Sequence, residues 1–148
     1  MSTYSFTDVQ ASLVGAGGAF QLGYGQATAE EGIDIQRAGD KNTMRIGSDG
    51  EGMHSLHADK SGTITLRYLK TAPVNAKLMA LSVAQSLSSS LWGQNVITVT
   101  NSASGDITTG RNCAFKKIPD LKYAKDGDIV EWVFDVIKID SMLGTYPA

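Results

Sequence analysis

The sequence predicts a mainly β fold, with two packed antiparallel sheets in a sandwich or barrel and one flanking α-helix. Apolar and polar residues alternate with a period of two in several stretches of the 148 residues, as in strands that bury one face. Turn-forming Gly, Asn, Asp and Ser residues separate these stretches. A single stretch, after Pro73, instead has its apolar residues at helical spacing.

The expected strands follow from the apolar positions of each alternation. The first ends at the glycine-rich turn 15–18. The last runs from Asp128 to about Asp140, which is about 40 Å at roughly 3.3 Å per residue. Two further β-rich runs, 95–100 and 107–116, flank the turn Ser104-Gly105-Asp106. The apolar faces of the other strands are Val9, Ala11 and Leu13; Ile33 and Ile35; Ile64, Leu66 and Tyr68; and Val130, Trp132, Phe134 and Val136.

A helix is predicted for residues 73–91. Pro73 suits the first turn, where its missing N–H costs no hydrogen bond. Serines 86 and 88–90 and Gly93 end the pattern. No linker or internal repeat is visible, so we expect a single domain over residues 1–148. The apolar stripe of the helix consists of Val74, Leu78, Leu81, Ala84 and Leu91.

Residues 38–62 are expected to form an extended loop. This segment is rich in Gly, Asp, Lys and Asn, yet Met44, Ile46, Met53 and Leu56 are scattered through it. Loops of this length are uncommon in a compact domain unless they have a function. The apolar residues would let the loop order against a neighbouring subunit, although composition alone also allows a flexible surface hairpin.

Charge and composition argue against several classes of protein. The net charge is −2 and no long basic run is present, which argues against tight binding of nucleic acid. Cys113 is the one cysteine, so the fold needs no disulfide. The first residues lack a signal-peptide pattern, and no apolar run approaches the roughly 20 residues of a membrane-spanning helix. We expect a protein made and folded in a cytoplasm, with no membrane partner.

Two patterns suggest a metal site, and neither is favoured. His54 and His57 are three residues apart, and in a loop or strand such positions point to opposite sides. Residues 40–51 superficially resemble a calcium loop, but Met44 occupies the fifth position and Arg45 replaces the turn glycine at the sixth. We therefore expect no metal and no cofactor, and ordinary surface or interface roles for both histidines.

No catalytic group is favoured either. The glycines at 15–18 are not followed by the Lys-Ser/Thr and helix of a phosphate loop. Cys113 shares an alternation face with Phe115, which predicts a small buried apolar residue, and the pattern identifies no histidine base for it. Glu30 and Glu31 are expected at the start of a polar loop, where neighbouring carboxylates need not converge. The chain is predicted not to be an enzyme.

A series of short motifs in a fixed order resembles the tail-tube proteins of bacteriophages. Residues 46–52 (IGSDGEG) contain a Gly-x-Asp-Gly-Glu turn, and residues 59–66 (DKSGTITL) resemble the start of the next strand in that family. Residues 71–75 (TAPVN) resemble its helix start, and residues 29–33 and 125–127 also fit. The order of the motifs covers nearly the whole chain and is more specific than any one of them.

The resemblance implies a structural subunit that forms hexameric rings, stacked into the tube through which the genome leaves. It implies contacts with further copies of the chain and with tail sheath, tape-measure and baseplate proteins, while DNA passes without specific binding. It favours a contractile tail and a virion protein made in the host bacterial cytoplasm. The loop 38–62 would contact an adjacent subunit through Asp40, Lys41, Asn42, Met44, Arg45, Ile46, Asp49, Glu51, Met53 and His54.

Two alternatives remain open. The inner-tube subunits of type VI secretion systems and of phage-like injection machines have a similar fold, and the sequence separates them poorly from tail tubes. A monomeric ligand-binding β-sandwich, such as a carbohydrate-binding module, is the second. It would be expected to show a cluster of exposed aromatic residues, whereas Trp92 and Trp132 are assigned to a helix end and a strand core.

Overall fold

The structure, a computed structural model of the chain, describes residues 2–23, 25 and 28–147, with the side chains of residues 28–31 set aside. Strands dominate it. In chain order the elements are η1 (Phe6–Asp8), β1 (Val9–Gly15), β2 (Gly18–Gln21), β3 (Thr28–Arg37), β4 (Asn42–Ile46), β5 (Gly52–Leu56), β6 (Gly62–Leu69), α1 (Val74–Gln85), β7 (Asn95–Asn101), β8 (Asp106–Lys117) and β9 (Ile129–Met142).

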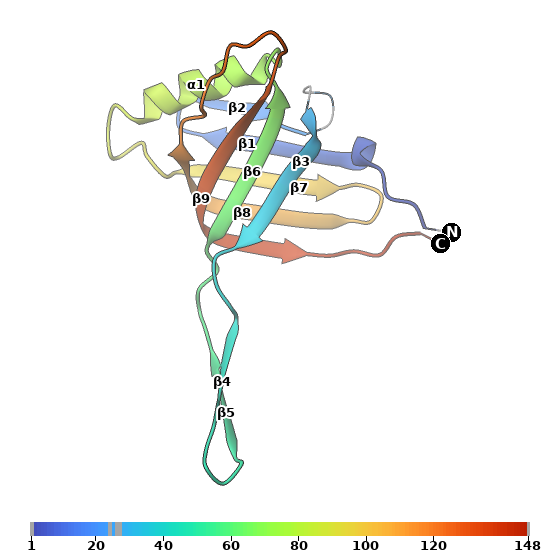
Figure 1. Cartoon of the computed structure of the whole chain (residues 1–148), viewed down its shortest axis with the longest axis vertical. Helices are drawn as coiled ribbons and strands as arrows, with labels where there is room; N and C mark the ends of the chain where they lie inside the picture. The colour runs from blue at the N-terminus through green and yellow to red at the C-terminus, as the bar shows by residue number, and fades with distance from the viewer. Residues whose placement is uncertain (1, 24, 26–27, 148) are drawn as a thin grey trace.

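Seven strands form one sheet in the order β2-β1-β7-β8-β9-β6-β3, and β4 and β5 form a separate two-stranded sheet. Every pairing between these strands is antiparallel. The large sheet folds over, so that β3, β6 and the first half of β9 lie across β1, β7 and β8 (Figure 1). The predicted class is confirmed, because the protein is mainly β, with antiparallel sheets and one helix. Within the described residues the edge strands β2 and β3 do not pair with each other, so no barrel is closed.

Strands β8 and β9 pass from one layer to the other. β9 pairs with β6 over residues 129–136 and with β8 over residues 133–142. In β8 the bend is marked by Asn112, whose φ of 55° lies in the left-handed region that Asn tolerates. The buried face of β9 changes phase nearby, since Val136 and Ile139 are buried while Ile137 is exposed. This change lets one strand supply core residues to both layers.

The hydrophobic core lies between the two layers and includes the apolar faces predicted for β1, β6 and β9. The Phe115 and Phe134 rings lie 4.6 Å apart, and Trp132 meets Phe115 edge-on at 5.9 Å between ring centroids. Tyr68 is fully buried and donates a 2.6 Å hydrogen bond to the carbonyl of Leu22. Burial raises the pKa of Tyr68, because the phenolate would lose its hydration.

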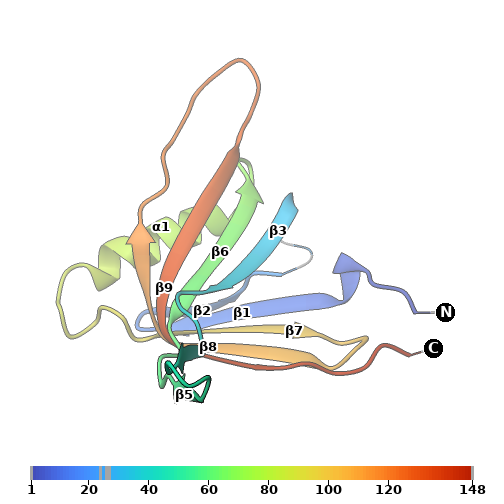
Figure 2. The same cartoon turned by 60° about the horizontal axis from the view of Figure 1, so that its bottom comes forward.

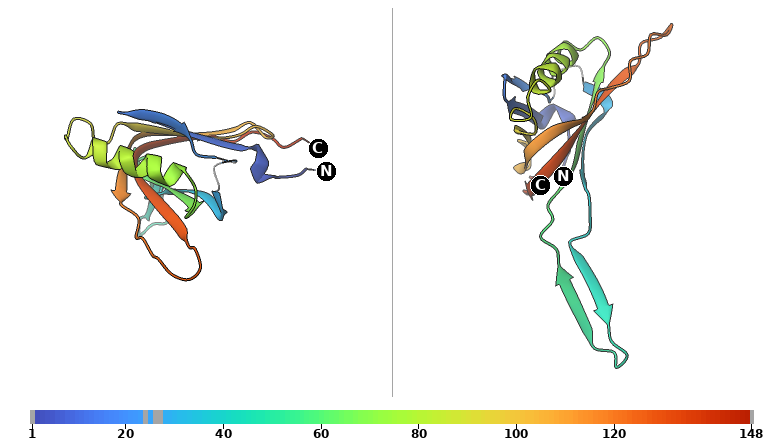
Figure 3. Two further views of the ribbon diagram at one scale, coloured as in Figure 1. Left: turned by 90° about the horizontal axis from the view of Figure 1, so that it is seen from above. Right: turned by 90° about the vertical axis from the view of Figure 1, so that its left-hand side faces the viewer.

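Helix α1 packs at one end of the two layers (Figure 3). It begins at Val74, one residue later than predicted, with Pro73 at the N-cap, and it ends at Gln85 rather than at residue 91. The N–H of Ser86 still bonds to the carbonyl of Ser82, and the chain then continues through turns that contain Leu91. The serines therefore end the helix earlier than the apolar spacing suggested.

The buried face of α1 also differs from the predicted stripe. Val74, Leu78 and Leu81 are buried as expected, but Ala84 is exposed, and the polar residues Ser82 and Gln85 are buried instead. Gln85 exchanges two side-chain hydrogen bonds with Asn95 of β7, at 2.6 and 2.9 Å. Because this buried pair is satisfied, a polar residue can occupy the helix interface, which apolar periodicity could not reveal.

The residues expected to begin a polar loop at Glu30 and Glu31 lie instead within β3. In the pairing of β3 with β6, Thr28 lies opposite Tyr68 and Ile33 lies opposite Leu66. The register shifts between Thr28 and Ile33. An irregular strand of this kind interrupts the alternation that identifies regular strands, which explains the wrong prediction. The two glutamate side chains lie outside the described part of the structure.

Candidate assembly surfaces

The strands β4 and β5 form a hairpin that projects far from the folded body (Figures 1 and 3). We call residues 38–61 the arm. The segment predicted as an extended loop is thus an ordered antiparallel hairpin, in which Asn42–Ile46 pair with Gly52–Leu56. All ten of these residues are exposed. No other described part of the chain packs over this hairpin, so its side chains are available to a second molecule.

The tip of the arm is a compact turn made by the Gly-x-Asp-Gly-Glu motif. The N–H of Gly47 donates to the carbonyl of Glu51 over 2.7 Å, and the N–H of Gly50 donates to the carbonyl of Gly47 over 3.1 Å. The carboxylate of Asp49 accepts from the N–H of Glu51. Gly50 has a φ of 88°, which favours glycine. The motif is therefore a hairpin turn, and it places the carboxylates Asp49 and Glu51 at the far end of the arm.

The register of the hairpin divides its side chains between two different faces. Met44 pairs with His54, Ile46 with Gly52, and Asn42 with Leu56, so all six residues share one face. A Cβ on Gly52 would lie 2.9 Å from Cδ1 of Ile46, so the glycine makes room for that side chain. The opposite face carries Thr43, Arg45, Met53 and Ser55. We call the face that carries Met44, Ile46 and Leu56 the apolar face of the arm.

The root of the arm is held by the Asp-Lys-Ser-Gly motif. The carboxylate of Asp59 accepts a 2.8 Å hydrogen bond from the N–H of Ser61, and hydrogen bonds with Ser61 keep the pKa of Asp59 below its ordinary value. Gly62 lies so close to its neighbours that an added Cβ would be 2.1 Å from the carbonyl oxygen of Gln36. The motif thus has a structural role where the arm joins the body.

A network of charged groups ties the same root to β9. Asp140 lies 3.1 Å from Nζ of Lys60 and 2.7 Å from the guanidinium of Arg111. Hydrogen bonding to Lys60, followed by its charge and by Arg111, keeps the pKa of Asp140 below its ordinary value. Arg37 donates to the carbonyl of Ile139 over 2.6 Å, and the N–H of Ile139 donates to the carbonyl of Lys60 over 2.8 Å. Because the ion pairs are exposed, each contributes little alone, and together with the two hydrogen bonds they link the root of the arm to β9.

The predicted contact residues are distributed over the whole arm rather than gathered at one point. Leu56 also lies on the apolar face, although it is not among the predicted contact residues; counting forward from Gly52 in steps of two along β5 places it there. Asp40 and Lys41 lie at the root, Asp49 and Glu51 at the tip, Asn42, Met44, Ile46 and His54 on the apolar face, and Arg45 and Met53 on the opposite face.

The two metal patterns do not converge in space. The ring Nδ1 of His54 lies 3.0 Å from the Asn42 amide nitrogen, whereas Nε2 of His57 lies 2.7 Å from the hydroxyl of Thr43. Asn42 and Thr43 belong to opposite faces, as expected for the histidines. The calcium-like pattern is stretched between Asp40 at the root and Glu51 at the tip. In the part of the chain that the structure describes, no group of three or more His, Cys, Asp or Glu could hold a metal ion.

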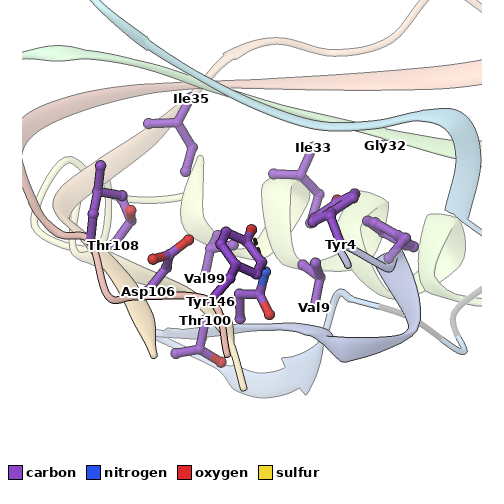
Figure 4. A pocket seen from close by; sticks show the side chains of 13 residues that line it. Tyr4, Val9, Gly32, Ile33, Ile35, Val99, Thr100, Asp106, Thr108 and Tyr146 are labelled. Atoms are coloured by element: carbon purple, nitrogen blue, oxygen red, sulfur yellow. Dashed lines mark hydrogen bonds between the residues drawn. The ribbon is translucent and has the colours of Figure 1, made fainter. Parts of the chain in front are cut away.

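A second surface, not predicted from the sequence, is a groove (Figure 4) at the end of the sandwich where the two terminal segments lie (Figure 2). Its volume is about 560 Å³, and its walls include Ile33 and Ile35 of β3 and Val99 of β7. The terminal segments contribute Tyr4 and Tyr146. No residue pattern indicated this groove, because its walls come from segments far apart in the chain.

Cys113 is fully buried, as predicted, and burial raises its pKa to about 11. The thiol lies 3.3 Å from the carbonyl oxygen of Gly110. Among the described residues, no helix is long and apolar enough to cross a membrane.

Among the described strands, β2 and β3 end the large sheet, and a projecting, partly apolar arm extends from the body that this sheet forms. The chain belongs to the bacteriophage PhiTE tail tube protein family, whose family model matches residues 1–144. The predicted resemblance to tail-tube proteins is confirmed by this match. Among curated protein sequences, none matches the chain.

Several solved structures share the fold. A chain of the sheath/tube terminator of the PVC extracellular contractile injection system, in its extended state, has a TM-score of 0.60 and 14% identity, with 96% of this chain and 98% of that chain covered. A chain from the sheath-tube complex of the same system has a TM-score of 0.55 and 14% identity, covering 90% and 88%. A chain of the anti-feeding prophage baseplate has a TM-score of 0.59 and 14% identity, covering 96% and 97%.

Proposed function

We propose that this protein is the structural, non-enzymatic subunit of a phage tail tube. Copies assemble into hexameric rings, and the rings stack to form the channel for DNA ejection. The observation that carries the proposal is the arm, which exposes Met44, Ile46 and Leu56 on one face in a member of the tail-tube family. Large apolar side chains that are exposed on a projecting hairpin contribute little to the stability of the monomer. Their burial by a neighbouring subunit would stabilise the assembly.

The unpaired edges of the large sheet support the same proposal. Among the described strands, β2 and β3 end the sheet and each pairs with a single neighbour, so each would offer its outer edge to a strand of another subunit. Such edges are an aggregation hazard in a monomer but serve as joints in a subunit that must polymerise. Heterologous contacts of this kind can close into a ring and also propagate along an axis.

The proposed partners are further copies of the chain, tail sheath, tape-measure and baseplate proteins, and DNA that passes without specific binding. The protein is proposed to be made in the host bacterial cytoplasm and to end in the virion tail. The fold similarity to chains from contractile injection systems supports a contractile tail. It also favours a second candidate function, the inner-tube subunit of an injection or secretion machine. Isolation of the native assembly distinguishes the two, since a phage tail would carry a DNA-filled capsid.

The test is negative-stain electron microscopy of the purified protein over a concentration series, with and without isolated baseplates as initiator. We expect rings or tubes with a central hole. A variant that lacks Gly47–Gly52 removes the tip turn and should remain a folded β-rich monomer, as checked by circular dichroism, that makes no tubes. Normal tubes from that variant would contradict the role of the arm. A monomer under every condition would contradict the tube function and favour a ligand-binding sandwich.

A further inference from the structure

The chain contains two Asp-Gly pairs, Asp49-Gly50 and Asp126-Gly127, and no Asn-Gly pair. An aspartate followed by glycine is prone to rearrange, because a glycine has no Cβ and leaves its backbone nitrogen open to the carboxyl group beside it. The first pair lies at the tip of the arm, and the second lies in the connection between β8 and β9, residues 118–128 (Figure 1). The two pairs therefore share their reactive atoms but differ in their surroundings.

The pair at the tip of the arm is held by the hairpin turn. The N–H of Gly50, whose nitrogen would have to attack, donates a 3.1 Å hydrogen bond to the carbonyl of Gly47. The carboxylate of Asp49 accepts a 3.1 Å hydrogen bond from the N–H of Glu51. Both reacting groups are engaged with other partners, and the pairing of β4 with β5 keeps the turn closed. The turn would have to open locally before these two groups could react with each other.

The pair in the connection between β8 and β9 is not restrained in this way. Asp126 and Gly127 are both exposed, and a Cβ added at Gly127 would meet nothing within 4 Å. Among the described residues, neither the N–H of Gly127 nor the carboxylate of Asp126 has a hydrogen-bond partner. Lys70 instead bonds to the connection on either side of the pair, at the carbonyls of Lys122 and Asp128. The backbone between these two anchors can rotate to bring the reacting atoms together.

We infer that Asp126-Gly127 is a site of spontaneous backbone rearrangement in the folded protein and that the hairpin turn protects Asp49-Gly50. In the reaction the nitrogen of Gly127 forms a bond to Cγ of Asp126, and the carboxyl hydroxyl leaves as water with the amide proton. Water then opens the five-membered imide. Attack at the former side-chain carbonyl restores aspartate, whereas attack at the backbone carbonyl gives isoaspartate, whose main chain runs through Cγ. One water is released and one is taken up, so the mass is unchanged.

The rearrangement acts on an exposed surface and leaves the core intact. It lengthens the main chain by one carbon just before β9, where the carbonyl and carboxylate of Asp128 accept hydrogen bonds from the N–H groups of Lys70 and Ile129. The added length is taken up on the other side of the pair, toward Tyr123, which is 84% exposed. Isoaspartate carries a free α-carboxylate. Methyltransferases that use S-adenosylmethionine esterify this group, so the rearranged chain becomes a substrate for that class of enzyme.

Ageing of the dilute, unassembled protein tests the inference, and the reaction does not depend on tube formation. The folded chain is kept at neutral pH and physiological temperature, and isoaspartate is located by electron-transfer fragmentation of its proteolytic peptides. We expect isoaspartate to form roughly tenfold faster at Asp126 than at Asp49, because the turn around Asp49 must open first. Equal rates, a faster reaction at Asp49, or no isoaspartate at Asp126 would overturn the inference.

Two controls separate the effect of the fold from that of the local sequence. In guanidinium chloride the unfolded chain should react at similar rates at both pairs, since the turn no longer holds Gly50. A difference that persists in the unfolded chain would attribute it to the neighbouring side chains and contradict protection by the hairpin. Gly127→Ala has room for its methyl group, which would hinder the attacking nitrogen, so it should remove most of the isoaspartate. Unchanged isoaspartate in this variant would exclude the imide route.

Discussion

The folded body and the arm are built from the same kind of strand but bury their side chains in opposite ways. In β6, Ile64, Leu66 and Tyr68 are fully covered by the other layer. In β4 and β5 every residue is exposed, although Met44, Ile46, Met53 and Leu56 are as apolar as core residues. The body therefore completes its core within one chain, whereas the arm offers apolar surface that only a second molecule can cover.

This difference separates stability from assembly. Substitutions in the body should lower the free energy of unfolding, because they remove packing that the monomer already has. Substitutions on the apolar face of the arm should leave the monomer unchanged and act on the tube. The root of the arm, where Gly62 and Asp140 lie, should show both effects.

The largest expected effect is the loss of Trp132 from the core. Trp132→Ala removes a ring packed against Phe115 and its 3.0 Å hydrogen bond to Asn75, and should lower the free energy of unfolding by about 3–5 kcal/mol. Chemical denaturation of the monomer measures this. Trp92 is 38% exposed, against 1% for Trp132, so Trp92→Ala is the matched control and should cost much less. Equal losses would contradict the assignment of the core.

A smaller loss is expected at the junction of arm and body. Gly62→Ala would place a Cβ 2.1 Å from the Gln36 carbonyl oxygen and should destabilise the protein by about 1–3 kcal/mol, because the backbone must shift. Gly127→Ala is the control, since an added Cβ there meets nothing within 4 Å. Thermal unfolding of both variants checks the difference. An unchanged melting temperature for Gly62→Ala would show that the junction is looser than described.

Loss of the buried Gln85–Asn95 hydrogen bonds should lower the free energy of unfolding by as much as Gly62→Ala, or by less. Gln85→Ala leaves the side chain of Asn95 without two of its hydrogen bonds and should cost about 1–3 kcal/mol. Gln94→Ala changes an exposed glutamine, with one hydrogen bond to the carbonyl of Ser90, and should be nearly neutral. Denaturation curves of the two variants would be compared directly. Similar curves would mean that the pair does not join α1 to β7.

On the apolar face of the arm, the expected change in monomer stability is within about 0.5 kcal/mol, while assembly is lost. Met44→Ser with Leu56→Ser removes two exposed apolar side chains from that face. Met53→Ser, on the opposite face, is the control and should retain more assembly. Denaturation reports the first property and electron microscopy the second. Normal tubes from the double variant would contradict the assignment of assembly to the apolar face of the arm.

The smallest effect should depend on pH. The pKa of Asp140 is lowered in the folded protein, so its stabilising contribution is fully present above the ordinary value of 3.8 and is lost as the pH falls through the lowered value. Asp140→Asn should therefore unfold slightly more easily than the wild type at pH 7, and the difference should vanish in strong acid. Denaturation midpoints at both pH values measure it. A difference that persists in acid would assign the effect to packing.

The sequence by itself determined the fold class and most of the regular strands. Alternation in residues 9–13, 64–68 and 130–136 identified buried faces because a strand that covers a core on one side must repeat every second residue. Pro73 identified the helix start for an equally local reason. The motif order also identified the tail-tube family, since each motif specifies a local turn or cap: residues 47–51 close the tip, and Asp59 and Gly62 shape the root.

The tertiary structure alone decided where the strands bend, where the helix ends and what the loop 38–62 becomes. The phase change between Val136 and Ile139 depends on β9 joining two layers, and the burial of Gln85 depends on Asn95, ten residues away. The connection between β8 and β9, residues 118–128, and the arm lie at opposite ends because β6 and β9 pair along their length. Such features follow from contacts between distant parts of the chain, and residue patterns report only on what a segment buries locally.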